Sequence, residues 1–238
     1  MKIIIDTPEK IAEKAALRYV ELLSNKPKAI LGLATGSTPI GLYKELVKLN
    51  KEGKISFKDA TTFNLDEYVG LEPTHDQSYR YFMNENLLSH IDVPMENTNV
   101  PSGIDIDKAA SYDSEIAAAG GVDLQLLGIG NNGHIGFNEP GTPFGSTTHL
   151  VDLTESTREA NARFFASIDD VPTQAVTMGI KTVMNAKSII LIALGKGKAE
   201  TIKATIQGEV TPEVPASVLQ LHPDVEVYLD HDAASLLD

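Results

Sequence analysis

A glycine-rich turn near the middle of the chain delivers a histidine and a carboxylate. The run LLGIGNNGHIGFNEP, residues 126–140, begins as an apolar strand and carries His134 and Glu139. Because glycine has no side chain, such a turn lets the backbone approach a ligand closely. The glutamate can orient the imidazole and favour its charged form, so the pair can transfer protons. A lone histidine is more often a hydrogen-bonded core residue, but the glycines before it and the NEP segment after it favour chemistry here.

The same turn matches the dinucleotide pattern G-x-G-x-x-G in letters, through Gly128, Gly130 and Gly133. As a nucleotide signal the match is weak, because no ribose-binding acid is expected at the right distance and His134 is expected at the start of a helix. We therefore interpret Gly130 and Gly133 as places where the backbone approaches a substrate.

A pair of acids follows another apolar run. The segment FNLDEYVG, residues 63–70, places Asp66 and Glu67 just past an expected strand. A carboxylate at the carboxyl end of a strand can take a proton from a carbon next to a carbonyl group. A surface acid or a helix cap explains the pair about equally well.

The segment ATGSTP, residues 34–39, joins a strand to a helix and contains Gly36, Ser37 and Thr38. Backbone N–H groups at a helix N-terminus, together with hydroxyls, can cradle a phosphate. The spacing is not that of a Walker loop, and an ordinary turn with Thr38 as the N-cap is the simpler explanation of this segment alone.

Two cations could complete an anion site. Lys198 is expected to begin a helix, where a lysine is less favourable than an acid, so its placement suggests an anion to hold. Arg163 lies between an alanine and two phenylalanines, where it can bind a phosphate through two hydrogen bonds. Single cations are more often simply solvated.

Strand-like runs alternate with helix-like runs, which predicts an α/β fold with a mostly parallel sheet covered by helices on both faces. We expect strands over 2–5, 29–34, 61–65, 122–129, 174–178, 188–194 and 225–229. We expect helices over 8–24, 39–50, 76–90, 108–119 and 198–207.

Ligands of open α/β sheets bind at the carboxyl ends of the strands. The four clusters at 35–38, 66–67, 128–139 and 195–198 follow strands, and we expect them to converge on one edge. No repeat or linker interrupts the chain, so residues 1–238 are expected to form one domain. The polar stretch at about 153–173 is expected to be a mobile lid, although a surface helix with loops is the more common meaning of such a stretch.

The composition excludes several classes of protein. With 238 residues the chain can bury a core unaided, and the absence of Cys removes disulfides and thiolate chemistry. Lys and Arg number 20 against 33 Asp and Glu, and a net charge of -13 opposes nucleic-acid binding. The six His are scattered, so no metal site is expected. Without a signal peptide or an apolar run of about 18 residues, a soluble cytoplasmic protein is expected.

Taken together, these segments resemble the glucosamine-6-phosphate deaminase family (glucosamine/galactosamine-6-phosphate isomerases). The resemblance covers nearly the whole chain, and LDEYVG and GHIGFNEP are its specific parts. It implies a doubly wound, Rossmann-like fold with a mobile lid. The matching segments are 34–39, 63–70, 128–140, 156–165, 194–199 and 217–223.

That family converts glucosamine 6-phosphate and water into fructose 6-phosphate and ammonia, a step of amino-sugar catabolism. The resemblance implies that His134 opens the sugar ring, that Glu139 orients and charge-balances the imidazole, and that Asp66 moves a proton from C2 to C1. No cofactor is implied, because the carbonyl of the substrate itself acidifies C2. The phosphate would be held by Gly36, Ser37, Thr38, Arg163 and Lys198.

Two departures from the family pattern matter. Many members carry Asp two residues before the catalytic histidine, where this chain has Asn132. An amide supplies no negative charge, so more of that role falls on Glu139, and we expect an altered pH profile rather than loss of activity. Hexameric members activated by N-acetylglucosamine 6-phosphate carry basic residues after NEP and a longer C-terminus. Residues 147–151 hold no Lys or Arg and the chain stops at Asp238, so we expect no such activation and a monomer or small homo-oligomer.

Two other functions compete with this one. A 6-phosphogluconolactonase shares the fold and a glycine–histidine turn, but lactone hydrolysis needs no acceptor for a C2 proton in an LDEY setting. A non-catalytic sugar-phosphate sensor would need a DNA-binding module, and it would not need Asp66, His134 and Glu139 together.

Overall fold

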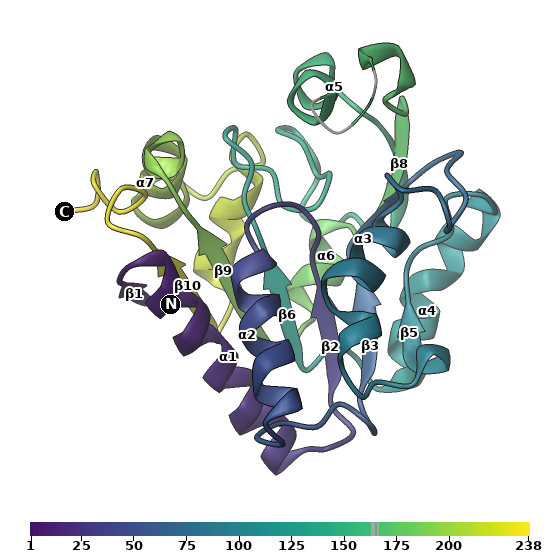
Figure 1. Cartoon of the computed structure of the whole chain (residues 1–238). Coiled ribbons are helices and arrows are strands. Elements are labelled where there is room, and N and C mark those ends of the chain that lie inside the picture. Colours follow the sequence, from purple (N-terminus) through teal and green to yellow (C-terminus); the bar gives the residue numbers. More distant parts are fainter. Residues whose placement is uncertain (163–164, 166) are drawn as a thin grey trace.

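A seven-stranded sheet forms the centre of the protein (Figure 1). The structure is a computed structural model that describes residues 1–162, 165 and 167–238. Every pair of neighbouring strands in this sheet is parallel, as expected for strands that alternate with helices. In spatial order the strands are β1 (Lys2–Ile5), β10 (Val225–Leu229), β9 (Ser188–Ala193), β6 (Leu124–Leu127), β2 (Ile30–Leu33), β3 (Thr61–Asn64) and β5 (Thr98–Asn99).

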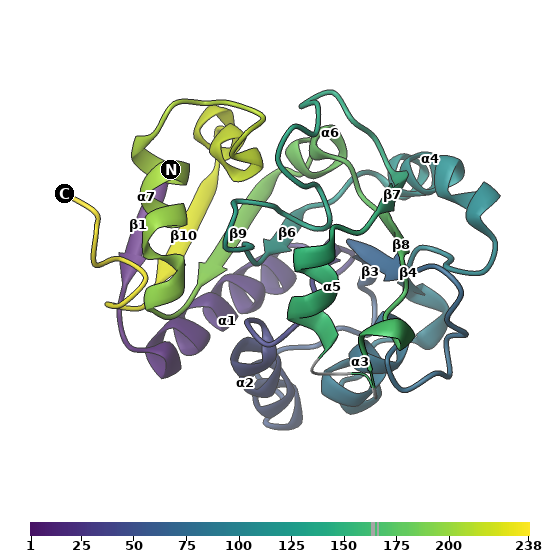
Figure 2. The ribbon, with the colours of Figure 1, turned by 90° about the horizontal axis from the view of Figure 1, so that it is seen from above.

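Helices cover both faces of the sheet. All residues of β2 and β6 are buried, which is typical of parallel strands enclosed on both sides. Figure 2 shows α1, α2 and α3 on one face and α4 and α6 on the other. The α-helices are α1 (Pro8–Asn25), α2 (Ile40–Lys51), α3 (Tyr79–Asn86), α4 (Ala109–Ala119), α5 (Glu155–Ala162), α6 (Ile180–Met184) and α7 (Ala199–Gln207). The 3-10 helices are η1 (Leu88–His90), η2 (Met95–Asn97), η3 (Ile106–Lys108), η4 (Ile168–Asp170), η5 (Lys196–Lys198) and η6 (Pro215–Leu221).

Local sequence signals explain where helix α1 begins and which of its faces is buried. The hydroxyl of Thr7 accepts a hydrogen bond from the backbone N–H of Lys10 at the start of α1, and Pro8 occupies the first helical turn. An apolar side chain every fourth residue then forms the buried stripe that packs on the sheet. The fully buried members of that stripe are Ile11, Ala15, Tyr19 and Leu23.

A second, smaller sheet was not expected. It is antiparallel, with the order β4 (Asp66–Tyr68), β8 (Gln174–Thr177) and β7 (His149–Asp152). The strand expected over 174–178 therefore exists but lies outside the main sheet. Short strands such as β4 are specified by tertiary contacts more than by their own sequence.

Two further expectations were wrong. The helix expected over 76–90 is shorter, because Ser78 caps α3 and Leu87 leaves the helical conformation with a φ of −146° before η1. His134 does not begin a helix; it lies in a turn, and the backbone N–H of Gly130 donates to the carbonyl oxygen of His134 at 2.9 Å.

The chain reverses its direction of winding between β2 and β6. From β2 the chain proceeds outward through β3 and β5, whereas from β6 it proceeds the other way through β9 and β10. Such a reversal leaves a crevice at the carboxyl ends of the two central strands, where ligands of doubly wound sheets bind. The predicted functional loops follow β2, β3, β6 and β9, which are four neighbouring strands.

Candidate active site

A pocket of about 840 Å³ occupies the carboxyl edge of these four strands. It brings together side chains from loops that lie far apart in the sequence, as the strand order predicts. The sequence-predicted residues that line it are Gly36, Ser37, Thr38, Asp66, Gly130, Asn132, His134 and Lys198. Glu139 and Gly133 lie behind this lining layer, and Arg163 lies outside the described residues.

His134 and Glu139 form the expected pair. His134 Nδ1 lies 3.5 Å from Glu139 Oε2, an ion-pair distance that is long for a hydrogen bond. Asn132 connects the two residues, because its Nδ2 donates to Glu139 Oε2 at 2.6 Å and its Oδ1 accepts from the backbone N–H of His134 at 3.2 Å. The amide therefore aligns the carboxylate and the turn that carries the imidazole.

The surroundings of Glu139 favour its ionised form. Burial by itself disfavours the charged carboxylate, but the contacts with His134, Thr157 and Asn132 outweigh it and lower the pKa of Glu139 to about 2. A carboxylate that accepts several hydrogen bonds is stabilised in this way. Glu139 is thus a negative charge beside the imidazole at neutral pH.

Asp66 has the opposite environment. It is 6% exposed, and burial together with the neighbouring charge of Glu67 raises its pKa to about 8. At pH 7 roughly a tenth of the free protein then carries an ionised Asp66. A carboxylate of raised pKa is a stronger base, which suits the removal of a proton from carbon.

Glu67 has a structural role, which the helix-cap alternative anticipated. Its carboxylate accepts hydrogen bonds from the backbone N–H groups of Tyr68, Tyr79 and Arg80, at 2.9, 2.8 and 2.9 Å. The bonds from Tyr79 and Arg80 satisfy otherwise unpaired N–H groups at the start of α3. The two adjacent acids therefore differ in role: Glu67 binds the N-terminus of α3, and Asp66 lines the pocket.

The turn at 130–138 is held in place from both sides. Asn138 Nδ2 donates to the carbonyl oxygens of Ile135 and Met178, at 2.9 and 2.7 Å. Gly136 has a φ of +59°, and a Cβ added there would lie 2.8 Å from Thr177 Oγ1 and 3.5 Å from Asp66 Oδ2. Asp66 and the turn that carries His134 are therefore close neighbours.

The loop after β2 adopts a modified form of the expected turn. Pro39, not Thr38, is the N-cap of α2, and Gly36 has a φ of +92° that favours glycine. With the cap one residue later than expected, Gly36, Ser37 and Thr38 all line the pocket. Lys198 enters from the other side, at the N-cap of α7.

The chain is similar to known proteins over nearly its whole length. Residues 6–228 match the family model described as glucosamine-6-phosphate isomerases/6-phosphogluconolactonase. The chain belongs to this family. The family resemblance predicted from the sequence is confirmed, as is the fold.

Two relatives that match nearly the whole chain are both named glucosamine-6-phosphate deaminase. The chain is 53% identical over 238 residues to a glucosamine-6-phosphate deaminase of Clostridium perfringens (strain 13 / Type A), covering 99% of this chain and 98% of that protein. It is 56% identical over 231 residues to the glucosamine-6-phosphate deaminase of Lachnoclostridium phytofermentans, covering 95% and 98%.

Among solved structures, a monomeric glucosamine-6-phosphate deaminase superposes with a TM-score of 0.97 at 46% identity, covering 99% of this chain and 100% of that one. A 6-phosphogluconolactonase from Trypanosoma cruzi has a TM-score of 0.77 at 21% identity, covering 99% and 96%, which shows the shared family fold alone.

Several residues that line this family pocket escaped the sequence reasoning. Tyr79 and Phe137 stack with a ring separation of 6.1 Å, and both line the pocket beside Asp66. Thr157 lies on α5 within a matching segment but was not singled out. The position of Phe137 between the predicted site residues His134 and Glu139 is the one sequence feature that could have predicted its place in the pocket. Tyr79 and Thr157 line the pocket because of tertiary contacts.

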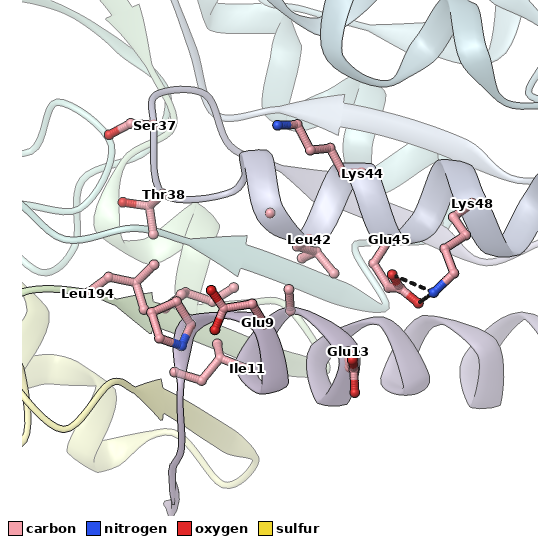
Figure 3. A pocket seen from close by; sticks show the side chains of 14 residues that line it. Glu9, Ile11, Glu13, Ser37, Thr38, Leu42, Lys44, Glu45, Lys48 and Leu194 are labelled. Atoms are coloured by element: carbon pink, nitrogen blue, oxygen red, sulfur yellow. Dashed lines mark hydrogen bonds and ion pairs between the residues drawn. The ribbon is translucent and has the colours of Figure 1, made fainter.

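A second hollow of about 410 Å³ lies on the other side of the loop after β2 (Figure 3). It shares Ser37, Thr38 and Leu194 with the pocket that holds Asp66 and His134. Its remaining lining comes mainly from α1 and α2 and includes neither of those two residues. The combination of acid, imidazole and phosphate loop therefore belongs to the larger pocket.

Within the residues that the structure describes, no three His, Cys, Asp or Glu side chains are placed to hold a metal ion. Across the same residues, none of the helices has the length and apolarity that a membrane crossing requires.

The Asn132 side chain gives a prediction. In Asn132→Asp, a second carboxylate would lie against Glu139 where the amide now donates at 2.6 Å. Like charges at this distance share a proton, so the pKa of the pair rises. We expect the pH profile of kcat to be altered in this variant, with the maximal kcat reduced by less than about tenfold. An unchanged pH titration of kcat and kcat/KM would contradict this.

Proposed function

We propose that the protein is a glucosamine-6-phosphate deaminase, which converts glucosamine 6-phosphate and water into fructose 6-phosphate and ammonia. The observation that carries this proposal is the meeting of Asp66, His134 and the phosphate-type loop in one pocket. Relatives of that name match at 53% identity over nearly the whole chain, which supports it. The expected enzyme class and function agree with these relatives.

The chemistry begins with ring opening. His134 takes the proton of the hydroxyl on C1 and delivers a proton to the ring oxygen, which frees the aldehyde at C1. Glu139, negatively charged beside the ring, stabilises the imidazolium that forms between the two transfers. The aldehyde then lowers the pKa of the hydrogen on C2.

Asp66 performs the isomerisation. Its ionised carboxylate removes the C2 proton to give an enolate, and the same carboxyl returns that proton to C1. The C1 oxygen takes up the proton that the amino nitrogen loses as it becomes an imine. The product is an imine at C2, to which water adds; ammonia leaves, and the ketone of fructose 6-phosphate remains. C1 of the sugar is reduced while C2 is oxidised within the same molecule, so this sequence requires no redox partner.

The phosphate would be held by backbone N–H groups and hydroxyls of Gly36, Ser37 and Thr38, with Lys198 opposite and Arg163 as a further ligand. A helix N-terminus with free N–H groups favours an anion. Two cations would reverse locally the potential of a chain whose net charge is -13.

The remaining expectations belong to the same proposal. Residues 1–238 form one domain, with about 153–173 as a mobile lid, and the protein acts in the cytoplasm as a monomer or small homo-oligomer. A solved relative described as monomeric supports the assembly. N-acetylglucosamine 6-phosphate is not an activator; a sigmoidal rate curve made hyperbolic by this compound would contradict that.

The deciding experiment measures ammonia release from glucosamine 6-phosphate in parallel with hydrolysis of 6-phosphogluconolactone. Ammonia release with fructose 6-phosphate as the second product supports the deaminase. Lactone hydrolysis without ammonia release would replace it with the lactonase of the same family, and binding of the sugar phosphate with neither reaction would indicate a sensor.

Lys198 provides a test of the phosphate site. In Lys198→Met, we expect KM for glucosamine 6-phosphate to rise about 10–100-fold with a smaller change in kcat, because one charge-assisted bond to the phosphate is lost. The matched control is Lys48→Met, since Lys48 lies on α2 beside the smaller hollow and pairs with Glu45 at 2.9 Å (Figure 3). Equal KM values for the two variants would remove Lys198 from the site.

A further inference from the structure

The buried side chain of Thr157 on helix α5 contacts Glu139, the partner of His134. Figures 1 and 2 show α5 standing over the end of the sheet where the pocket lies. Thr157, in the first turn of α5, is 7% exposed and lines the pocket, whereas Glu155 and Glu159 on the same helix are exposed. Thr157 therefore has a position unlike that of its charged neighbours.

The hydroxyl of Thr157 donates to Glu139 Oε1 at 2.5 Å. The other carboxylate oxygen, Oε2, faces Asn132 and His134. Each oxygen thus has its own partners, and rotation of the carboxylate would break contacts on both sides. Among the described residues, His134 is the one basic side chain within ion-pair distance of Glu139.

A second threonine fixes the direction of that hydrogen bond. Thr154 Oγ1 accepts from the backbone N–H of Thr157 at 3.2 Å and donates to Thr157 Oγ1 at 3.0 Å. A hydroxyl has one O–H to donate. Because Thr157 accepts a hydrogen bond from Thr154, its own O–H is available to donate to Glu139. A chain of two hydroxyls consequently ends on the carboxylate.

The segment around α5 does not depend on this bond for its attachment. Arg158 donates to the carbonyl oxygens of Ile168 and Val171, at 2.9 and 3.3 Å. Phe165 packs edge-on against Tyr68, with ring centroids 5.9 Å apart. Removing the Thr157 hydroxyl should therefore disturb the carboxylate more than the fold of the segment.

We propose that Thr157 is a positioning residue, which holds the Glu139 carboxylate with Oε2 toward His134, so that the pair is complete when α5 is seated over the pocket. This inference deepens the proposed deaminase function and rests on it. Thr157 acts through Glu139, not on the reacting atoms. Its hydroxyl is also one of the donors that lower the pKa of Glu139, against the effect of burial.

Three variants test this. Thr157→Val keeps the shape and loses the hydroxyl, and Thr157→Ser keeps the hydroxyl. Thr205→Val is the matched control, because the buried Thr205 hydroxyl on α7 has no hydrogen-bond partner among the described residues. For Thr157→Val we expect kcat to fall about 10–100-fold, the loss of one hydrogen bond to a charged group. We also expect the pKa of the Glu139 carboxyl group to rise, because one of the hydrogen bonds to its charged form is lost.

Thr157→Ser should restore kcat to within about threefold of wild type, since the bond to the charged group is retained. Thr205→Val should match wild type in both readouts. An unchanged kcat in Thr157→Val, or a Thr157→Ser variant as impaired as Thr157→Val, would overturn the positioning role.

A second measurement does not depend on the reaction. The ¹³C carboxyl signal of Glu139 is followed against pH in wild type and Thr157→Val, and we expect it to titrate at higher pH in the variant. If wild type released no ammonia, the proposed function would fail, and this titration would still decide the contact: equal titration curves would overturn it.

Discussion

Replacing Asp66 with asparagine is expected to lower kcat for ammonia release by about 10²–10⁴-fold, the range typical for loss of a general base. An amide has nearly the shape of a carboxyl group but cannot take the C2 proton. KM should change little, because the phosphate loop and Lys198 lie on other loops of the pocket. Steady-state assays of ammonia release give both constants.

The same substitution should stabilise the protein at neutral pH. Burial raises the pKa of Asp66 from an ordinary 3.8 to about 8, so between these values the folded state binds a proton that the unfolded state does not. Wild-type stability therefore falls as pH rises from about 4 to about 8, at about 1.4 kcal/mol for each unit. The Asp66→Asn variant has no such slope, and at pH 7 the gain should be a few kcal/mol, or roughly 5–10 °C in Tm.

Thermal unfolding at pH 5, 7 and 8 checks the sign, since the difference between variant and wild type should grow with pH. The matched control is Asp59→Asn, because Asp59 is exposed on a loop. Ammonia release from Asp66→Asn at the wild-type rate would remove Asp66 from its role. A variant that is inactive and also less stable at pH 8 would mean that Asp66 is structural.

Much of this site could be predicted because it depends on strand order. Strands β2, β3, β6 and β9 are apolar runs followed by glycine or polar clusters, and the carboxyl ends of parallel strands share one edge. Chain direction alone therefore placed the His134 turn and Asp66 together. The specific residue types then supported a family that the comparisons confirm.

What the sequence did not predict depends on tertiary contacts. The pKa of Asp66 follows from its burial and from the neighbouring charge of Glu67, and the depth of that burial is not visible in the pattern of FNLDEYVG. The bond from Thr157 to Glu139 joins α5 to the end of the turn that carries His134, and α5 follows a small sheet that the sequence does not predict. Asn132 was expected only to lack a charge, whereas its amide also donates to Glu139.

Substituting alanine for Gly130 is expected to lower kcat about 10²-fold while the fold is retained. A Cβ at Gly130 would lie 2.3 Å from Cε1 of His134 and 2.4 Å from each ring nitrogen, closer than any real contact. The backbone there is held, since the N–H of Gly130 donates to the carbonyl oxygen of His134, so the ring must move. A displacement of about 1 Å in a catalytic group can cost this much activity.

The imidazole is the flexible partner in this clash, which is why activity should fall more than stability. The matched control is Gly145→Ala, because no atom of the described residues lies within 4 Å of a Cβ added at Gly145. We expect Gly130→Ala to keep the Tm within a few degrees of wild type and to perturb the His134 ring signals in NMR spectra. A variant with wild-type kcat would show that the ring does not need to rest against Gly130 to open the sugar. A variant that unfolds would show that the close approach serves the fold instead, and would leave the ring-opening role to be judged from His134→Gln.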